Sequence, residues 1–250
     1  MSSFLITGAS RGFGLGIVRE LASRPSSAVG KIFATARGDS PALNELAKEH
    51  RSRIFVLKLD VTDETSIQKA AEDVKAGLGS KGLDVLINNA GICPRTDGII
   101  SMDNLQDGFD THVFGVHWVI RAFLPLLQEG NLKKVANIAS FLASITLAAD
   151  AQYLPSPAYK ISKAAMGALT VQYALEYEEE GFSFIAVCPG WMKTELGGGD
   201  VADLTTEEAA KASLDIILTP GQTYNGQMRK VHVKGWEDRS YCYDGTSVPW

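Results

Sequence analysis

Cysteine is scarce in this chain of 250 residues: it occurs three times, as Cys93, Cys188 and Cys242. The number is odd, the positions are far apart, and no CxxC or Cys/His spacing accompanies them. This pattern argues against a disulfide framework and against a zinc site, so that we expect no metal. Reduced thiols of this kind are typical of an intracellular compartment.

Long hydrophobic runs and a large excess of one charge are also missing. No stretch approaches the roughly 18 consecutive apolar residues that a membrane helix needs. The N-terminal apolar run, Phe4 to Ile6, is short and lacks the basic region of a secretion signal. The formal net charge of -5 disfavours nucleic acid or an anionic membrane as the main partner. We therefore expect a soluble, cytoplasmic protein.

The composition is that of a globular protein. Hydrophobic residues make up 45% and charged residues 21% of the chain. The length suits one domain, and no repeat, charge block or linker divides it. We expect a single domain over residues 1–250 that ends in an aromatic tail, residues 235–250.

Short apolar runs rich in β-branched residues alternate with longer amphipathic stretches. Continuous apolar runs are typical of strands that helices cover on both faces. Two helix starts are marked, by Ser40-Pro41 and by Thr205 with Glu208 three residues later. The alternation predicts an α/β fold, a Rossmann-type doubly wound parallel sheet of about seven strands flanked by helices. The candidate strands are residues 4–7, 31–36, 54–59, 85–88, 135–139, 184–187 and 228–233.

A glycine-rich stretch, TGASRGFG at residues 7–14, directly follows the first strand and opens a helix. Glycines permit a tight turn and close approach of the backbone to a ligand. The helix start points free N–H groups and a positive dipole end at a pyrophosphate. A merely tight corner is the alternative, but the position at the first strand-to-helix turn favours a dinucleotide site. The candidate contacts are Gly8, Ser10, Arg11, Gly12, Phe13 and Gly14.

The end of the second strand distinguishes NAD from NADP. An NAD site usually places Asp or Glu there for the ribose hydroxyl, whereas an NADP site offers Arg. This chain has Arg37 at that place, and Arg11 provides a second guanidinium within the glycine loop. There are two alternatives. Both arginines are solvated at the surface, or Asp39 turns back to a ribose hydroxyl. We expect NADP(H) in preference to NAD(H).

Tyr159 and Lys163 stand four residues apart in a stretch with helical periodicity, so that they share one face. A phenol is a poor proton donor at neutral pH, because its reference pKa is about 10. A nearby ammonium favours the phenolate and lowers that pKa. The pair is suited to give a proton to a carbonyl oxygen, although YxxxK alone is also a common surface pair.

Ser140 follows the fifth strand, where ligands of open α/β sheets gather. Its hydroxyl is expected to hydrogen-bond the substrate oxygen and orient it toward Tyr159. Ser144 is the rival candidate, and a structural serine is the alternative to both.

Taken together, these motifs resemble those of the short-chain dehydrogenase/reductase family over nearly the whole chain. The run YLPSPAYKISK and the stretch GQTYNGQMRKVHVKGW resemble the carbonyl reductase branch described as C-factor-like or sniffer-like. By that resemblance Tyr159 and Lys163 are catalytic, and Lys163 also binds the nicotinamide ribose. The other cofactor contacts implied are Asp60, Val61, Asn88, Ala90, Gly91, Pro189, Gly190, Met192 and Thr194.

His112 departs from the family pattern, which has an asparagine at this place that holds a water for proton relay. A histidine offers two ring nitrogens and an ordinary pKa near neutrality, so that we predict a catalytic role for His112. A buried structural histidine is the alternative.

The function expected is reversible NADPH-dependent reduction of a ketone or aldehyde, with Tyr159 as general acid/base. A substrate loop is expected around residues 190–205, where Gly197-Gly198-Gly199 suggests a hinge. The resemblance implies a homodimer or homotetramer. Two alternatives remain: a cofactor-binding regulator without turnover, which His112 would favour, and an enzyme that uses the tyrosine for cyclisation or dehydration.

Overall fold

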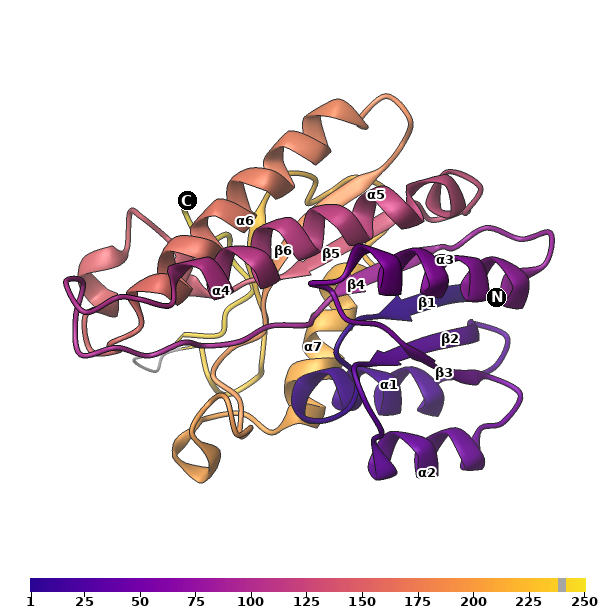
Figure 1. Ribbon diagram of the computed structural model, residues 1–250, viewed down its shortest axis with the longest axis horizontal. Coiled ribbons are helices and arrows are strands. Elements are labelled where there is room, and N and C mark those ends of the chain that lie inside the picture. The colour runs from indigo at the N-terminus through magenta and orange to yellow at the C-terminus, as the bar shows by residue number, and fades with distance from the viewer. Residues whose placement is uncertain (238–241) are drawn as a thin grey trace.

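The sheet of this protein has seven parallel strands in the order β3-β2-β1-β4-β5-β6-β7. The computed structural model describes residues 1–237 and 242–250 (Figure 1). The predicted Rossmann-type single domain is thereby confirmed. The strands are β1 (Ser2–Ile6), β2 (Val29–Ala36), β3 (Ile54–Lys58), β4 (Val85–Asn88), β5 (Lys134–Ile138), β6 (Ser183–Cys188) and β7 (Met228–Lys230).

The last strand is shorter than its sequence pattern, which predicts a strand over residues 228–233. Beyond Lys230 the backbone forms hydrogen bonds with the C-terminal tail, which runs back along it, and the regular strand ends there. The Gly245 amide donates to the Val231 carbonyl at 3.2 Å, and the Val233 amide donates to the Tyr243 carbonyl at 2.9 Å. The strand prediction is therefore wrong for these last residues.

Helices cover both faces of the sheet (Figure 1). On one face lie α1 (Gly12–Ser23), α2 (Pro41–Glu49) and α7 (Thr206–Ile217); on the other lie α3 (Glu64–Leu78), α5 (Gly115–Gln128) and α6 (Pro157–Glu176). A short α4 (Leu105–Phe109) and a single π-helical turn, Asp110–Phe114, lead into α5. No helix in the described part of the chain is long and apolar enough to cross a membrane.

The helix starts form as the sequence predicts. The Ser40 side chain accepts a hydrogen bond from the Leu43 amide, and Pro41 opens α2. Thr205 and Glu208 form a reciprocal capping box at the start of α7. Local capping chemistry thus places both helices against the sheet at defined residues.

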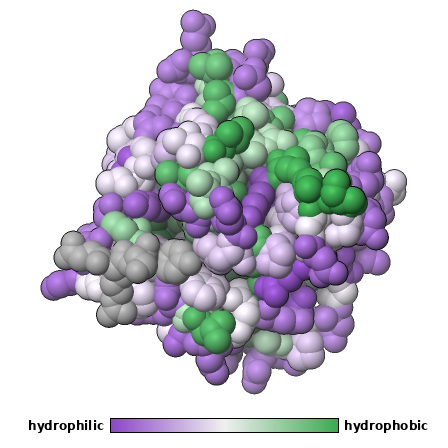
Figure 2. All heavy atoms as spheres, turned by 90° about the vertical axis from the view of Figure 1, so that its left-hand side faces the viewer, coloured by the Kyte–Doolittle hydropathy of each residue, from purple (hydrophilic) through white to green (hydrophobic). Residues whose placement is uncertain are grey.

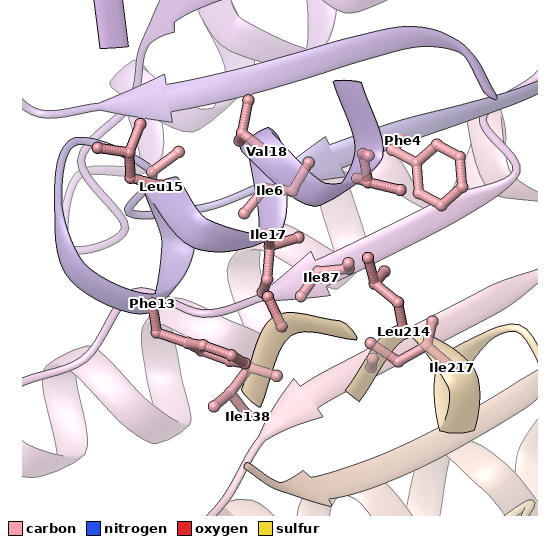
Figure 3. Close-up of a cluster of buried hydrophobic side chains, with 14 of the residues drawn as sticks. Phe4, Ile6, Phe13, Leu15, Ile17, Val18, Ile87, Ile138, Leu214 and Ile217 are labelled. Carbon is pink, nitrogen blue, oxygen red and sulfur yellow. The ribbon is translucent and has the colours of Figure 1, made fainter. Parts of the chain in front are cut away.

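The hydrophobic core divides into two clusters, one on each face of the sheet. Figure 3 shows the cluster under α1 and α7, where the Phe13 ring lies beside Ile138. Phe13 therefore joins the turn after β1 to the end of β5 through apolar packing, and only 6% of it is exposed. This packing fixes the start of α1 relative to the end of β5.

A buried carboxylate fixes the amino ends of the central strands, at the end of the sheet opposite the site. Asp84 is 4% exposed and precedes β4. Its oxygens accept from the Ser3 amide and from the Asn131 amide, each at 2.8 Å. One side chain therefore ties the start of β1 to the turn before β5.

We predict that Asp84→Ala lowers the free energy of unfolding by about 3 kcal/mol, because hydrogen bonds to a charged group each contribute about 1.5–3 kcal/mol. Urea unfolding followed by circular dichroism measures this. Asp73→Ala on the exposed side of α3 is the control and is expected to change stability by less than about 0.5 kcal/mol. Equal stability of the two variants would contradict the role of Asp84.

Candidate active site

A cavity of about 1000 Å³ lies at the carboxyl ends of the strands. Its walls come from the segments that follow β1 to β6, among them residues of the turns after β1 and β4. These two strands are neighbours in the sheet although β2 and β3 separate them in sequence, so that the chain reverses direction across the sheet there. Such a switch point is where open α/β sheets bind ligands. Figure 2 looks onto this face of the molecule.

The glycine loop is built for close approach. A Cβ on Gly14 would lie 2.4 Å from the Gly8 carbonyl oxygen and 2.5 Å from the Asn89 side chain, so that no other residue fits. Helix α1 begins at Gly12, and its N-cap residue Arg11 makes no capping hydrogen bond from its side chain. The first amides of α1 therefore remain available to an anion.

The loop is joined to the turn after β4 by side chains that the sequence analysis did not single out. Thr7 is buried, and its hydroxyl accepts from the Asn89 and Ala90 amides, each at 3.0 Å. The Asn89 amide group donates in return to the carbonyls of Thr7 and Gly8. Asn89 lies between Asn88 and Ala90, two of the predicted cofactor contacts, but only its contacts in the structure show its role.

Asn88 does not line the cavity, and the expectation that it contacts the cofactor is wrong. Its side chain is buried in the sheet, where it donates to Asn137 at 2.8 Å. Asn137 donates in turn to Thr170 on α6 at 2.9 Å. The strand alternation points Asn88 away from the cavity and leaves Asn89 beside it.

The adenosine side of the cavity carries opposite charges. Arg37 lies at its wall together with Asp60. Partial burial raises the pKa of the Asp60 carboxyl, but hydrogen bonds from Thr62 and the charge of Arg37 outweigh it, so that the pKa lies below its usual value. Asp39 accepts from Asn44 at 2.7 Å, which directs that oxygen toward α2.

Arg11 is engaged across the mouth of the cavity. Its guanidinium forms an ion pair with Glu195, and both side chains are 75% exposed. The pair joins the glycine loop to the segment after β6. An exposed pair of this kind contributes little to stability, so that the guanidinium remains able to exchange partners.

These features fit a dinucleotide. Backbone amides at the start of α1 suit the pyrophosphate, Arg37 suits a phosphate on the ribose, and a glycine cradle leaves room for both. The cavity wall includes all the predicted cofactor contacts except Asn88: Gly8, Ser10, Arg11, Gly12, Phe13, Gly14, Arg37, Asp60, Val61, Ala90, Gly91, Tyr159, Lys163, Pro189, Gly190, Met192 and Thr194.

Tyr159, Lys163 and Ser140 meet at the other end of the cavity. Tyr159 and Lys163 lie one turn apart on α6 and are 9% and 4% exposed. The Lys163 Nζ donates to the Ile138 carbonyl at 2.5 Å, which anchors it to the end of β5. Ser144 is buried and accepts from the Leu147 amide, so that Ser140 and not Ser144 lies at the cavity.

Burial controls the acidity of both groups on α6. Burial raises the pKa of the Tyr159 phenol well above its ordinary value, while its hydrogen bond with Ser140 acts in the opposite direction. Burial lowers the pKa of Lys163 to about 7. The net shift of the Tyr159 pKa is therefore opposite to the lowering expected from the sequence, because loss of solvation is its largest cause.

His112 is fully buried and does not line the cavity, but its ring lies edge-on to the Tyr159 ring with centroids 5.7 Å apart, so that its catalytic role stays a prediction. Its Nε2 accepts from the Ile92 amide at 3.2 Å, so that the proton resides on Nδ1. Nδ1 donates to the Ser162 hydroxyl at 2.9 Å, and that hydroxyl donates to the Ala158 carbonyl at 2.7 Å. Both ring nitrogens are engaged within the protein, which leaves neither for a relay water.

The segment after β6 lines the cavity. It contains a 3₁₀ turn, Gly199–Val201, and the Trp191 indole donates to the Gly197 carbonyl at 2.7 Å. The predicted substrate loop therefore borders the cavity, while the hinge motion of its glycines stays a prediction. Of the aromatic tail, Trp236, Tyr243 and Trp250 are described, and Tyr241 lies outside the described residues.

Comparison with known proteins agrees with this geometry. The profile of the short chain dehydrogenase family matches residues 3–204. The short-chain dehydrogenase/reductase AacuF of Aspergillus aculeatus is 39% identical over 201 residues, which cover 76% of this chain and 74% of AacuF. An uncharacterized oxidoreductase of Schizosaccharomyces pombe is 30% identical over 98% of this chain and 97% of its own length.

Two solved structures are similar over the full chain. The NADPH-bound carbonyl reductase from chicken fatty liver has a TM-score of 0.87 and 30% sequence identity, with coverage of 100% of this chain and 99% of that one. The carbonyl reductase Sniffer of D. melanogaster has a TM-score of 0.86 and 29% identity, with coverage of 100% of both chains.

The burial of His112 predicts a loss of stability in acid. Burial and the nearby Lys163 lower the pKa of His112 from 6.5 to about 2, despite the hydrogen bond from Ile92. The unfolded chain therefore binds a proton below pH 6.5 that the folded protein does not. The stabilisation is complete above that pH and falls by about 2 kcal/mol at pH 5.

We expect His112→Asn to lose less stability than the unmodified protein between pH 8 and pH 5, measured by urea unfolding at each pH. His50→Asn at the end of α2 controls for the removal of a histidine. An equal loss of unfolding free energy in the unmodified protein and in His112→Asn would contradict the prediction, because it would show that the His112 ring binds its proton in the folded state as well.

Proposed function

This chain belongs to the short-chain dehydrogenase/reductase family, and from that premise we propose that it reduces a ketone or aldehyde with NADPH, in a reaction that is reversible in principle. The observation that carries the proposal is the meeting of Ser140, Tyr159 and Lys163 at one end of a cavity whose other end suits a dinucleotide. The similarity to a carbonyl reductase with bound NADPH supports it.

The proposed chemistry divides between cofactor and protein. When bound, the nicotinamide supplies the hydride. The Ser140 hydroxyl holds the substrate oxygen beside Tyr159, and the phenol gives that oxygen its proton. The ammonium of Lys163 favours release of this proton by stabilising the phenolate.

Reduction and oxidation require opposite protonation states of Tyr159. Because burial raises the pKa of the phenol, Tyr159 carries its proton throughout the neutral range. A protonated phenol is ready to donate, which is what reduction of a carbonyl requires. Oxidation of an alcohol requires the phenolate and is therefore expected to need a higher pH.

The remaining parts of the hypothesis concern partners and location. A homodimer or homotetramer stays a prediction from the family resemblance, and a cytoplasmic location stays a prediction from the composition of the chain. Exposed apolar side chains on the outer helices, such as Phe114 and Ile161, are consistent with contacts between copies of the chain. A regulator without turnover stays an alternative, since both ring nitrogens of His112 are engaged within the protein.

We predict that Tyr159→Phe lowers kcat by about 10²- to 10⁴-fold, because the proton donor is removed. Loss of NADPH absorbance against a panel of ketones, quinones and imines measures turnover, and fluorescence titration measures NADPH affinity. Affinity is expected to fall far less than turnover.

Tyr173→Phe is the matched control, because Tyr173 lies on the same helix and pairs with His117 at 2.8 Å, away from the cavity. Unchanged turnover in Tyr159→Phe would refute the proton step. Tight NADPH binding by the unmodified protein without turnover of any compound in the panel would favour the non-redox alternatives.

The preference for NADPH rests on Arg37. We predict that Arg37→Asp weakens NADPH binding about 10- to 100-fold more than NADH binding, because a charge-assisted contact with the ribose phosphate is lost. Titration with each cofactor measures the difference. Arg19→Asp, on the exposed side of α1, is the control; equal weakening of both cofactors in Arg37→Asp would contradict the assignment.

A further inference from the structure

A second cavity of about 460 Å³ adjoins the catalytic one. The two have five wall residues in common, Phe141, Tyr153, Cys188, Gly190 and Trp191. Three of the five are aromatic, so that aromatic side chains line the boundary between the chambers. The second chamber therefore borders the end of the site where Ser140 and Tyr159 lie, and not the adenosine end.

The C-terminal tail builds the far side of this chamber. The Val248 amide donates to the Met228 carbonyl at 2.8 Å, and the Lys230 amide donates to the Thr246 carbonyl at 3.1 Å, so that the tail runs along β7. Thr146 then donates to the Trp250 carbonyl from its amide at 3.2 Å and from its hydroxyl at 2.7 Å. The tail thereby holds the segment after Ser140 in place as the opposite wall.

A tyrosine of the tail connects the chamber to the turn after β6. The Tyr243 hydroxyl accepts from the Trp191 amide at 3.2 Å and donates to Asp203 at 2.6 Å. Tyr243 is buried, and its ring stacks at a tilt on Trp236 with centroids 5.6 Å apart. The chamber is thus fixed to the same turn that borders the catalytic cavity.

The chemistry of the chamber walls favours a neutral apolar group. Leu147, Val248 and Pro249 add aliphatic surface to the aromatic wall. Among the described residues of the wall, Lys230 carries the ammonium, which is paired with Asp244 at 3.0 Å. Asp150 is exposed at the rim and carries a negative charge that disfavours an anionic ligand.

We propose that this chamber is a distal subsite of the substrate pocket and takes a second aromatic ring, so that the substrate is a neutral aryl ketone larger than one ring. The inference rests on the proposed function, since the reacting carbonyl is taken to lie between Ser140 and Tyr159. Aromatic rings prefer offset or edge contacts with such walls. The volume lies within the range of small-molecule pockets.

The test compares acetophenone with 4-acetylbiphenyl, which adds one ring beyond the ketone-bearing ring. Isothermal titration calorimetry in the presence of NADP⁺, which has no hydride to transfer to a ketone, gives the Kd of each, and NADPH absorbance measures turnover separately. The second ring is expected to lower the Kd at least about tenfold. The free energy gained by burying an aromatic ring exceeds the free energy that corresponds to a tenfold change in Kd.

Two variants fill the chamber from different walls. Leu147→Trp projects from the segment after Ser140, and Pro249→Trp projects from an exposed position of the tail, where replacement leaves the core intact. In both variants the Kd of 4-acetylbiphenyl is expected to be less than about twofold below that of acetophenone. The Kd of acetophenone itself is expected to stay unchanged. Leu175→Trp is the matched control, since Leu175 is 64% exposed on α6 and borders neither cavity.

The outcomes separate the subsite from the reaction. Equal affinity for the two ketones, no binding of 4-acetylbiphenyl, or a gain that survives in both filled variants would overturn the subsite. Oxidation of NADPH by acetophenone alongside any of these results would leave the proposed reaction standing. Preferential binding of 4-acetylbiphenyl without turnover of either ketone would support the subsite and refute the reaction.

Discussion

The site depends on the contact between the turn after β1 and the turn after β4. The buried hydroxyl of Thr7 accepts two amide hydrogen bonds from Asn89 and Ala90, and Asn89 returns two bonds to the glycine loop. This contact joins the halves of the sheet at the switch point and leaves the start of α1 facing the cavity. A Cβ on Gly14 would break it, so that the glycine is required by packing as much as by a ligand.

Burial is the common cause of the unusual acidities around the catalytic helix. The same loss of solvation raises the pKa of the Tyr159 phenol, lowers the pKa of Lys163 to about 7 and lowers the pKa of His112 to about 2. Each shift favours the neutral form of the group. A neutral phenol is the form that donates a proton, whereas a neutral imidazole with both nitrogens bonded is a structural brace between Ile92 and α6.

The substrate end of the cavity is assembled from segments that are remote in sequence. The segment after Ser140, the turn containing Trp191 and the tail beyond Cys242 meet around two adjoining chambers. The tail has few regular elements, yet its backbone pairs with β7 and its last residue holds Thr146. The shape of the pocket therefore depends on the docking of the tail onto the sheet and α6.

Local pattern predicted the seven strands, the capped helices, and the places of Arg37, Ser140, Tyr159 and Lys163, because strand periodicity, capping chemistry and position at strand ends are properties of neighbouring residues. The contacts of a side chain are made with residues of other segments, and the sequence alone does not show which residues these are. Tertiary packing turned Asn88 into the sheet, engaged both nitrogens of His112, reversed the expected pKa shift of Tyr159 and ended β7 at Lys230. Burial and competition for hydrogen bonds, which arise only between distant segments, decided each of these outcomes.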